Sequence, residues 1–483
     1  MRDRLTGHVG WMAGVGMAVL AILGWAVDWP FVLALPLAGL LAWWAFARLD
    51  LFLMVVLAWV PLSVNLGEFG LVSMGWYVPT EPMLFGLLVL FVVRMLSGQT
   101  PHAALLQHPA TWIILAGFMW MGLTILPSSH VVVSLKAWIA RAWFIAAFYF
   151  LLAEWFRSSP QARHQFLALI LIPLSVVVGY TLIRHSGYGF SKAAGHWVMK
   201  PFFKDHTSYG AVLAMMIPPV VAMVWRQSQS TLARVMWSLG LAWLVLGTIL
   251  SFTRAAWVSL AAVAGLWVLM KLGVKLKSAV AGGLVALGLL SLSFDALVIQ
   301  LERNKQDSSD DLAQHVESIS NVSSDDSNLE RLNRWSCAWA MFQARPIWGF
   351  GPGTYQFEYA PFQTSSLRTR ISTNNADLGN AHSEYLGPLA EQGLVGLLAF
   401  LGLLLVTCHL GFKLHRVLVN PDDRRLAMGL FLGLMTYFVH GVLNNYLDTD
   451  KASAPFWGFL ALLVVMDLQA QNTGKSHEEI ATS

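Results

Sequence analysis

The sequence predicts an all-α membrane protein whose helices cross the bilayer many times. Hydrophobic residues make up 56% of the 483 residues and charged residues only 12%, whereas soluble domains are about a quarter charged. Apolar runs of about 18 to 22 residues recur from residue 9 to residue 467. Each run is long enough to cross a hydrocarbon core of about 30 Å as a helix, so we expect about 12 to 14 spans.

The expected spans divide the chain into three parts. Residues 1–294 form a transmembrane bundle of about 11 spans, residues 295–392 form one long polar loop, and residues 393–483 hold the last spans and a short tail. The first apolar run is as long as a true span and another follows directly, so we expect it to remain as an anchor. The fourteen apolar runs lie at about 9–27, 30–47, 49–66, 82–97, 109–127, 133–156, 165–184, 207–226, 232–251, 254–271, 275–294, 393–412, 425–444 and 454–468.

The positions of lysine and arginine predict the orientation of the chain. Short loops that carry these residues face the cytoplasm, and alternating spans bring nearly all such loops to one side. Both termini are then cytoplasmic and the loop 295–392 lies outside. One outer connection departs from the rule, since residues 184–204 carry four cations, and an anionic ligand would explain them. The cations of the cytoplasmic loops are Arg2, Arg4, Arg48, Arg94, Arg157, Arg163, Arg226, Arg234, Lys271, Lys275, Lys277, Lys413, Arg416, Arg424, Arg425 and Lys475.

The polar loop has two halves of different character. Residues 303–330 are rich in Ser, Asp and Asn and predict a mobile surface excursion. Residues 330–345 return to helical spacing, with Leu332, Trp335, Trp339 and Phe342 on roughly one face. Pro346 and the glycines at 349, 351 and 353 then stop this helix and form a tight turn.

Several classes of function are excluded or left without support. The net charge of +4 is explained by topology, because no basic soluble module is present to bind nucleic acid. Cys337 and Cys408 lie in different environments, so we expect neither a disulfide nor a metal site. The sequence has no Walker A loop, no His-Glu-x-x-His and no Gly-x-Ser-x-Gly, and we expect no cofactor.

His382 is the candidate general base. It stands just before the span that begins near Gly393, with Asp377 and Asn380 upstream and Glu384 two residues on. A neutral imidazole beside a carboxylate can remove a proton from an attacking hydroxyl. The alternative is a polar residue at the membrane interface with no chemical role.

Four candidate cations lie at or near the outer boundary. Arg254 begins a span and either binds phosphate through its guanidinium fork or anchors to lipid headgroups. Arg141 lies at membrane depth, where an ionisable group usually faces a cavity, with a structural ion pair as the alternative. Lys200 and Lys204 precede a span, near His206 and Tyr209, where the alternative is a solvated helix cap. The full polar cluster is Lys200, Lys204, Asp205, His206 and Tyr209.

The order of these motifs resembles that of bacterial O-antigen ligases and polymerases. His382-Ser383, nine residues, Gly393, two residues and Gly396 match the pattern His-(Asn/Ser/Gln)-x9-Gly-x2-(Gly/Thr/Tyr) of these ligases. The segment from Arg334 to Thr354 is similar to part of their periplasmic loop, the run 251–254 to their arginine element, and residues 203–210 to their outer-boundary motif.

The resemblance implies a metal-independent, inverting glycosyltransferase of GT-C-like architecture in the bacterial inner membrane. The donor would be a glycan on undecaprenyl pyrophosphate at the periplasmic face, and the acceptor a hydroxyl, with lipid A–core favoured. His382 would then be the base, and Arg254 would hold the pyrophosphate. Lys200, Lys204 and Arg141 are the candidates for the second cation, which is usually an arginine. Supporting roles are implied for Asn380, Glu384, His206, Tyr209, Gly393 and Gly396.

Other functions remain open on the sequence. Relatives with the same motifs polymerise repeat units of O-antigen or exopolysaccharide, or glycosylate proteins. A transporter for lipid-linked glycans would explain the outer cations and Arg141, but it would not need a histidine at a fixed distance from Gly393. A non-catalytic scaffold of the cell envelope is a third class.

Overall fold

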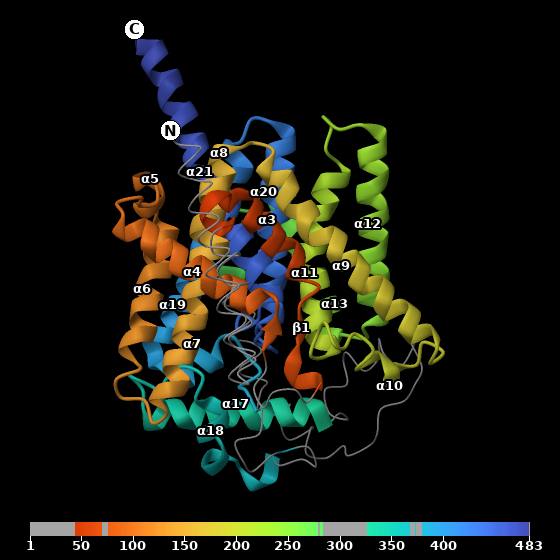
Figure 1. Cartoon of the computed structure of the whole chain (residues 1–483), viewed down its shortest axis with the longest axis vertical. Helices are drawn as coiled ribbons and strands as arrows, with labels where there is room; N and C mark the ends of the chain where they lie inside the picture. Colours follow the sequence, from red (N-terminus) through yellow and green to blue (C-terminus); the bar gives the residue numbers. More distant parts are fainter. Residues whose placement is uncertain are drawn as a thin grey trace, which may run out of the picture.

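A computed structural model describes residues 44–69, 76–278, 281–283, 326–367, 372 and 379–482. These residues are mostly helical, and the long helices run side by side along the long axis of the molecule (Figure 1). Two of the apolar helices are shorter than a full span, at Leu49–Trp59 and Pro109–Leu123. The chain is therefore an all-α, multi-pass membrane protein, as predicted. Seven described helices are long and apolar enough to cross a membrane: Val131–Ser158, Ala162–Ser186, His206–Val224, Thr231–Leu250, Arg254–Lys271, Leu386–Val417 and Asp450–Asn472.

The described elements follow one another in a simple order along the chain. They are α3 (Leu49–Trp59), β1 (Val64–Asn65), β2 (Tyr77–Val78), α4 (Thr80–Leu96), α5 (Ala103–Leu106), α6 (Pro109–Leu123), α7 (Val131–Phe144), the π-helix η3 (Ile145–Leu151), α8 (Leu152–Ser158), α9 (Ala162–Ser186), α10 (Lys192–Gly195), α11 (His206–Val224), α12 (Thr231–Leu250), α13 (Arg254–Lys271), α17 (Asp326–Ala344), α18 (Tyr355–Glu358), α19 (Leu386–Val417), α20 (Pro421–His440) and α21 (Asp450–Thr482). Short 3₁₀ helices lie at Leu66–Phe69, Ala360–Phe362 and Ser365–Leu367.

Most predicted spans coincide with a described helix to within a few residues, but two boundaries were wrong. The run at 49–66 is helical only to Trp59, because Pro61 cannot donate a helical hydrogen bond. The chain then forms β1, which pairs antiparallel with β2. The run at 393–412 begins at Leu386, so the His382 motif stands directly before a helix. The spans predicted at 9–27, 30–47 and 275–294, and the excursion at 303–330, lie wholly or largely outside the described residues.

Helices α11 and α21 are the most completely buried spans, while α12 and α13 lie at the periphery. Gly429 and Gly433 on α20 face α11, where an added Cβ would lie 2.8 Å from the Pro218 carbonyl oxygen and 2.6 Å from the Met215 carbonyl oxygen. Pro219 has no N–H to bond the Met215 oxygen. The two glycines allow the backbones to approach as in a small-xxx-small membrane interface.

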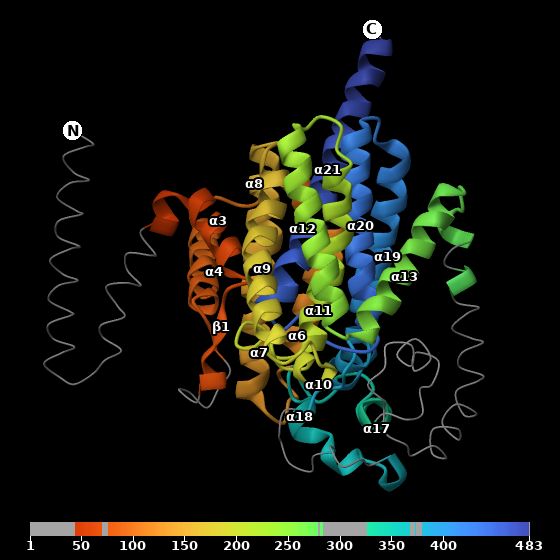
Figure 2. The same cartoon turned by 90° about the vertical axis from the view of Figure 1, so that its right-hand side faces the viewer.

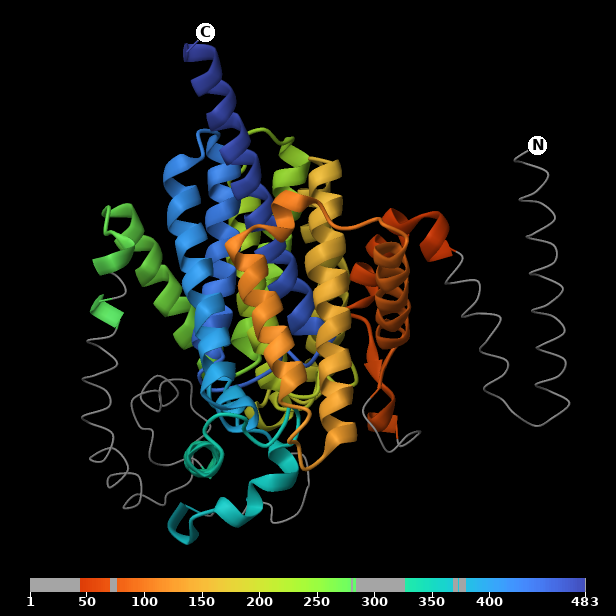
Figure 3. The ribbon, with the colours of Figure 1, turned by 90° about the vertical axis from the view of Figure 1, so that its left-hand side faces the viewer.

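Helix α17 lies across one end of the bundle, nearly perpendicular to the spanning helices, and the C-terminal part of α21 projects from the other end (Figure 1). We call these the α17 end and the far end. The predicted helix at 330–345 is confirmed, but its packed face holds Cys337, Ala338 and Met341, which contact the segment around Tyr355, while Trp339 is exposed. Helices α3 and α4 stand on the side of the bundle opposite α13 (Figures 2 and 3).

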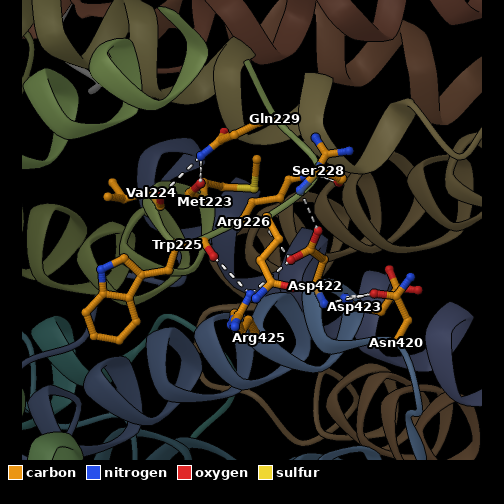
Figure 4. Close-up of polar contacts among 11 residues, drawn as sticks. Met223, Val224, Trp225, Arg226, Ser228, Gln229, Asn420, Asp422, Asp423 and Arg425 are labelled. Carbon is orange, nitrogen blue, oxygen red and sulfur yellow. Dashed lines mark hydrogen bonds and ion pairs between the residues drawn. The ribbon is translucent and has the colours of Figure 1, made fainter. Parts of the chain in front are cut away.

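Ion pairs close the far end. Asp422, at the start of α20, accepts hydrogen bonds from the main-chain N–H of Gln227 (2.9 Å) and of Ser228 (3.1 Å). Arg425 donates to Asp422 (3.1 Å) and to the carbonyl oxygen of Trp225 (3.0 Å). Figure 4 shows these contacts between the end of α11 and the start of α20. They fix the two most closely packed helices at the end away from α17.

Candidate functional site

A polar cavity of about 310 Å³ lies at the α17 end. Its walls come from the start of α11, from α17, from the segment before α19 and from the α20–α21 loop. Segments far apart in the sequence therefore meet around one hollow, and the lining combines cations, carboxylates, amides and two histidines. The lining residues are Tyr77, Phe203, Lys204, Asp205, His206, Thr207, Ser208, Val212, Arg331, Asn380, His382, Asn444, Asn445, Tyr446, Asp448, Thr449, Lys451 and Ala452.

His382 occupies the wall of this cavity in an unusual backbone conformation. Its φ is +47°, in the left-handed region that non-glycine residues rarely adopt. The Asn380 side-chain oxygen accepts the His382 N–H at 3.1 Å, and Ser383 Oγ accepts the N–H groups of Tyr385 and Leu386 at the start of α19. Such a conformation persists only when its surroundings impose it, and here the short polar residues on both sides do so.

The imidazole of His382 is neutral at neutral pH. Burial, followed by the guanidinium groups of Arg331 and Arg334, lowers the pKa of His382 to about 4, although Asp205 and Glu330 act in the opposite direction. The side chain is nevertheless only partly covered and faces the cavity. A neutral ring of this kind can accept a proton or a hydrogen bond from a hydroxyl that enters the cavity.

Three cations line the same cavity. Lys204 is exposed to it and has no ion-pair partner within the described part of the chain. Arg331 projects from α17. Lys451 is 4% exposed, forms an ion pair with Asp450 at 3.5 Å, donates to the Ser63 carbonyl oxygen at 3.0 Å and lies 4.5 Å from the Tyr77 ring centroid. These cations outnumber the two carboxylates of the lining, Asp205 and Asp448, and an excess of positive charge in a partly enclosed hollow favours an anionic ligand.

Arg254 lies near this cavity because α13 begins beside the start of α11. It is the first residue of α13, and Thr253 Oγ1 donates to the His206 carbonyl oxygen at 2.8 Å. The His206 ring lines the cavity and stacks on His196 with centroids 4.3 Å apart. Gly210 permits this contact, since an added Cβ would lie 2.7 Å from Thr253. The structure thus brings Arg254 beside the cavity, although its side chain is not part of the lining.

A second chamber of about 270 Å³ adjoins the first and shares with it Lys204, Asn380, Asn445 and Asp448. Arg141 lines this chamber, and no described residue forms an ion pair with it. Burial and the Glu384 carboxylate raise the pKa of Asp448 to about 6, while Lys204 and Arg141 act in the opposite direction. The remaining polar lining includes Ser383, Tyr355, Gln356, Glu391 and Gln392.

Three predicted site residues lie elsewhere or act differently. Lys200 forms an ion pair with Glu68 at 2.9 Å and is outside both chambers. Tyr209 is buried in the bundle against Phe203. Glu384 has no described hydrogen bond to His382.

Glu384 instead fastens the α20–α21 loop. Its Oε1 accepts the N–H groups of Tyr446 (2.8 Å) and Leu447 (2.9 Å) and the Tyr437 hydroxyl. Its own N–H donates to the Gly441 carbonyl oxygen at 2.7 Å. The carboxylate therefore holds in place the loop that carries Asp448, and it does not assist the imidazole directly.

The glycines of the motif have a structural role. Gly393 kinks α19 with φ +69° and ψ −165°, and an added Cβ would lie 2.1 Å from the Ile347 carbonyl oxygen. The Leu394 N–H then donates to the Pro346 carbonyl oxygen at 2.9 Å. At Gly396 an added Cβ would lie 2.8 Å from the Pro388 carbonyl oxygen. The kink thus makes room for the turn after α17. Contact between this turn and α19 positions α17 over the cavity.

Sequence reasoning missed Arg331, Lys451 and Asp448. Asp448 and Lys451 lie in the outer connection between the predicted spans 425–444 and 454–468, where a lysine departs from the positive-inside rule, so only Lys451 carried a signal. Arg331 lies in the polar loop, where nothing in the sequence distinguishes it from other charged residues. Within the described ranges, no group of three His, Cys, Asp or Glu side chains is placed to hold a metal ion.

Comparison with known families bears on this arrangement. Residues 239–401 match the family model described as O-antigen ligase. The resemblance to the O-antigen ligase and polymerase superfamily is thereby confirmed. The matched region runs from α12 to the kinked part of α19, so it contains Arg254, Arg331, His382 and both motif glycines. An O-antigen ligase domain indicates a membrane glycosyltransferase-type enzyme that handles a lipid-linked glycan and a glycan acceptor. No curated protein matches the chain.

Proposed function

We propose that the protein transfers a glycan from undecaprenyl pyrophosphate to an acceptor hydroxyl, with inversion and without a metal ion. Lipid A–core is the acceptor that we favour. The observation that carries the proposal is the convergence of His382, Lys204, Arg331 and Lys451 on one cavity, with Arg254 beside it. The matched O-antigen ligase domain supports the same class of reaction.

His382 acts as the general base in this proposal. The acceptor oxygen attacks the anomeric carbon of the first donor sugar, the bond from that carbon to the phosphate oxygen breaks, and undecaprenyl pyrophosphate leaves. The acceptor proton passes to the neutral imidazole. An imidazole with a pKa of about 4 is a weak base, but the negative charge of a bound diphosphate raises its proton affinity.

The cations stabilise the leaving diphosphate. Negative charge develops on the phosphate oxygen as the glycosidic bond breaks, and fixed cations in a partly enclosed site stabilise that charge strongly. Lys204 extends into the cavity, Lys451 is held in its wall, and Arg254 approaches from the start of α13. These groups supply the charge that a divalent metal provides in other transferases.

The second chamber fits the acceptor better than the diphosphate. Its polar lining has three carboxylates, Glu384, Glu391 and Asp448, and several amides around two cations, Arg141 and the shared Lys204. Carboxylates outnumber cations in this chamber, whereas in the first cavity three cations face the two carboxylates Asp205 and Asp448. An excess of carboxylates repels a diphosphate but accepts hydrogen bonds from sugar hydroxyls. We therefore assign Arg141 to the acceptor side, instead of the donor pyrophosphate that the sequence suggested.

The charge pattern sets the proposed orientation. The cations of the predicted cytoplasmic loops that the structure describes gather at the far end, among them Arg163, Arg226, Arg424 and Arg425. By the positive-inside rule the far end then faces the cytoplasm. Both chambers face the periplasm of a bacterial inner membrane, where a flipped lipid-linked glycan is presented.

A transfer assay with purified protein tests the proposal. The protein is given an undecaprenyl-pyrophosphate glycan and lipid A–core in the presence of EDTA, and products are resolved by gel and mass spectrometry. We expect glycan on lipid A–core, and a loss of about 100-fold or more for His382→Ala, with His409→Ala, an exposed histidine on α19, as the control. Elongated glycan still on undecaprenyl pyrophosphate would show a polymerase, and no product with any acceptor would favour transport.

A pair of lysines tests the donor site. Lys204 lines the cavity, whereas Lys200 is four residues upstream and already paired with Glu68. We expect Lys204→Gln to weaken donor binding by about tenfold and Lys200→Gln to leave it within twofold. Equal effects of the two substitutions would contradict the assignment of the cavity.

A further inference from the structure

A separate apolar groove of about 780 Å³ lies in the far half of the bundle. Its walls are α11, α13 and α20, and α13 leans away from the rest of the bundle toward the far end (Figure 2). Neither Arg254 nor any cavity residue takes part in it. Aliphatic side chains dominate the walls: Ile217, Val221, Leu260, Val263, Met428 and Leu432.

Cations stand at one end of this groove. Lys271 ends α13, and Arg424 lies in the first turn of α20. The carboxylates of the same turn are already engaged. Asp422 accepts from Arg425 and two main-chain N–H groups (Figure 4), and Asp423 pairs with Arg163 at 2.9 Å. Lys271 and Arg424 have no carboxylate partner among the described residues, so this end of the groove carries uncompensated positive charge.

The length of the groove corresponds to one leaflet. From Leu260 to Lys271 the α13 axis rises about 16 Å at about 1.5 Å per residue, which is about half of a hydrocarbon core of about 30 Å. Trp225 and Trp267 line the charged end, as aromatic residues do at the membrane interface. A ligand that fits has an acyl chain of one leaflet's depth and a negative headgroup at the far end.

We propose that the groove binds an anionic phospholipid of the cytoplasmic leaflet, with its phosphate between Lys271 and Arg424. The donor lipid does not fit this place, because its diphosphate belongs at the α17 end. Anionic headgroups gain free energy from each nearby Lys or Arg, and the acyl chain fills the apolar walls. A lipid here packs α13 against α20, and α13 begins with Arg254.

Native mass spectrometry of the purified full-length protein tests the site. The protein is equilibrated in detergent with phosphatidylglycerol and phosphatidylcholine of the same acyl chains, and the retained lipids are counted. We expect the parent to retain phosphatidylglycerol in preference. The double variant Lys271→Gln/Arg424→Gln should lower the ratio of retained phosphatidylglycerol to phosphatidylcholine by about tenfold or more.

Two further variants keep the outcome interpretable. Arg94→Gln/Arg234→Gln removes two cations of the predicted cytoplasmic loops that do not line the groove, and it should keep the parental ratio. Ala264→Trp fills the groove with the cations intact, and it should lower retention of both lipids. An unchanged ratio in the Lys271/Arg424 variant, or undecaprenyl phosphate displacing phosphatidylglycerol at equal concentration, would overturn the proposal. The test does not use glycan transfer, so its failure leaves the proposed function untouched.

Discussion

Substitutions of Glu384 test whether its carboxylate stabilises the fold or takes part in the reaction. Glu384 is 6% exposed, and its Oε1 accepts from two main-chain N–H groups and from the Tyr437 hydroxyl. In Glu384→Ala these donors lose their acceptor inside the protein, although the Tyr446 N–H keeps a bond to the Tyr437 oxygen at 3.0 Å. An unsatisfied buried donor costs about 1–3 kcal/mol, so we expect a total loss of about 2–6 kcal/mol.

Glu384→Gln is the matched control. Glutamine keeps an acceptor oxygen of the same shape and loses only the charge assistance, which we expect to cost about 1 kcal/mol. Thermal unfolding in detergent should therefore rank the proteins as parent, Gln, then Ala. Transfer measured below the melting transition should follow the same order, because the loop that Glu384 fastens carries Asp448. The reasoning is refuted if Gln loses transfer as completely as Ala while both melt like the parent.

Four further predictions concern the segment from Asn380 to Gly393 and the candidate phosphate ligand Arg254. Gly393→Ala should lower the melting temperature by several degrees because its Cβ meets the Ile347 carbonyl oxygen at 2.1 Å, whereas Gly265→Ala, with no atom within 4 Å of the added Cβ, should not; equal melting would refute the kink. Asn380→Ala should lower kcat about tenfold and leave the melting temperature unchanged, with Asn380→Asp restoring much of kcat; a loss confined to KM would argue against positioning. With a pKa of about 4, His382 stays neutral until the pH falls toward 4, so its modification by diethyl pyrocarbonate, followed by mass spectrometry, should stay constant from pH 8 to 5.5 while free histidine with a pKa of about 6.5 slows; parallel slowing would contradict the lowered pKa. Arg254→Lys keeps the charge but loses the fork, and should reduce turnover by about tenfold or more; an unchanged rate would mean that Arg254 only anchors to headgroups.

The spans were predictable because membrane helices depend mainly on length and apolarity. The apolar run at 254–271 coincides with α13 residue for residue. The run at 49–66 did not, because hydropathy alone does not register how Pro61 ends a helix. The start of α19 was misplaced for a related reason, since Gly393 was taken as a boundary and is instead a kink inside a longer helix.

The site was only partly predictable. His382 and Lys204 fall in the cavity, as their positions at span ends suggested. Glu384 does not support the imidazole, because two residues of separation across the start of a helix direct the two side chains to different partners. Arg331 and Asp448 join the cavity through α17 and the α20–α21 loop, and contacts between such distant segments leave no periodic signal in the sequence.

A structure with the donor tests the central claim most directly. Electron cryo-microscopy of the protein in lipid nanodiscs, with a non-hydrolysable undecaprenyl pyrophosphate glycan, would locate the diphosphate. We expect it within ion-pair distance, about 4 Å, of Lys204 and Arg254, with the anomeric carbon facing His382 across a gap that one acceptor hydroxyl can fill. A diphosphate bound outside this cavity, or a sugar turned away from the imidazole, would contradict the enzymatic account.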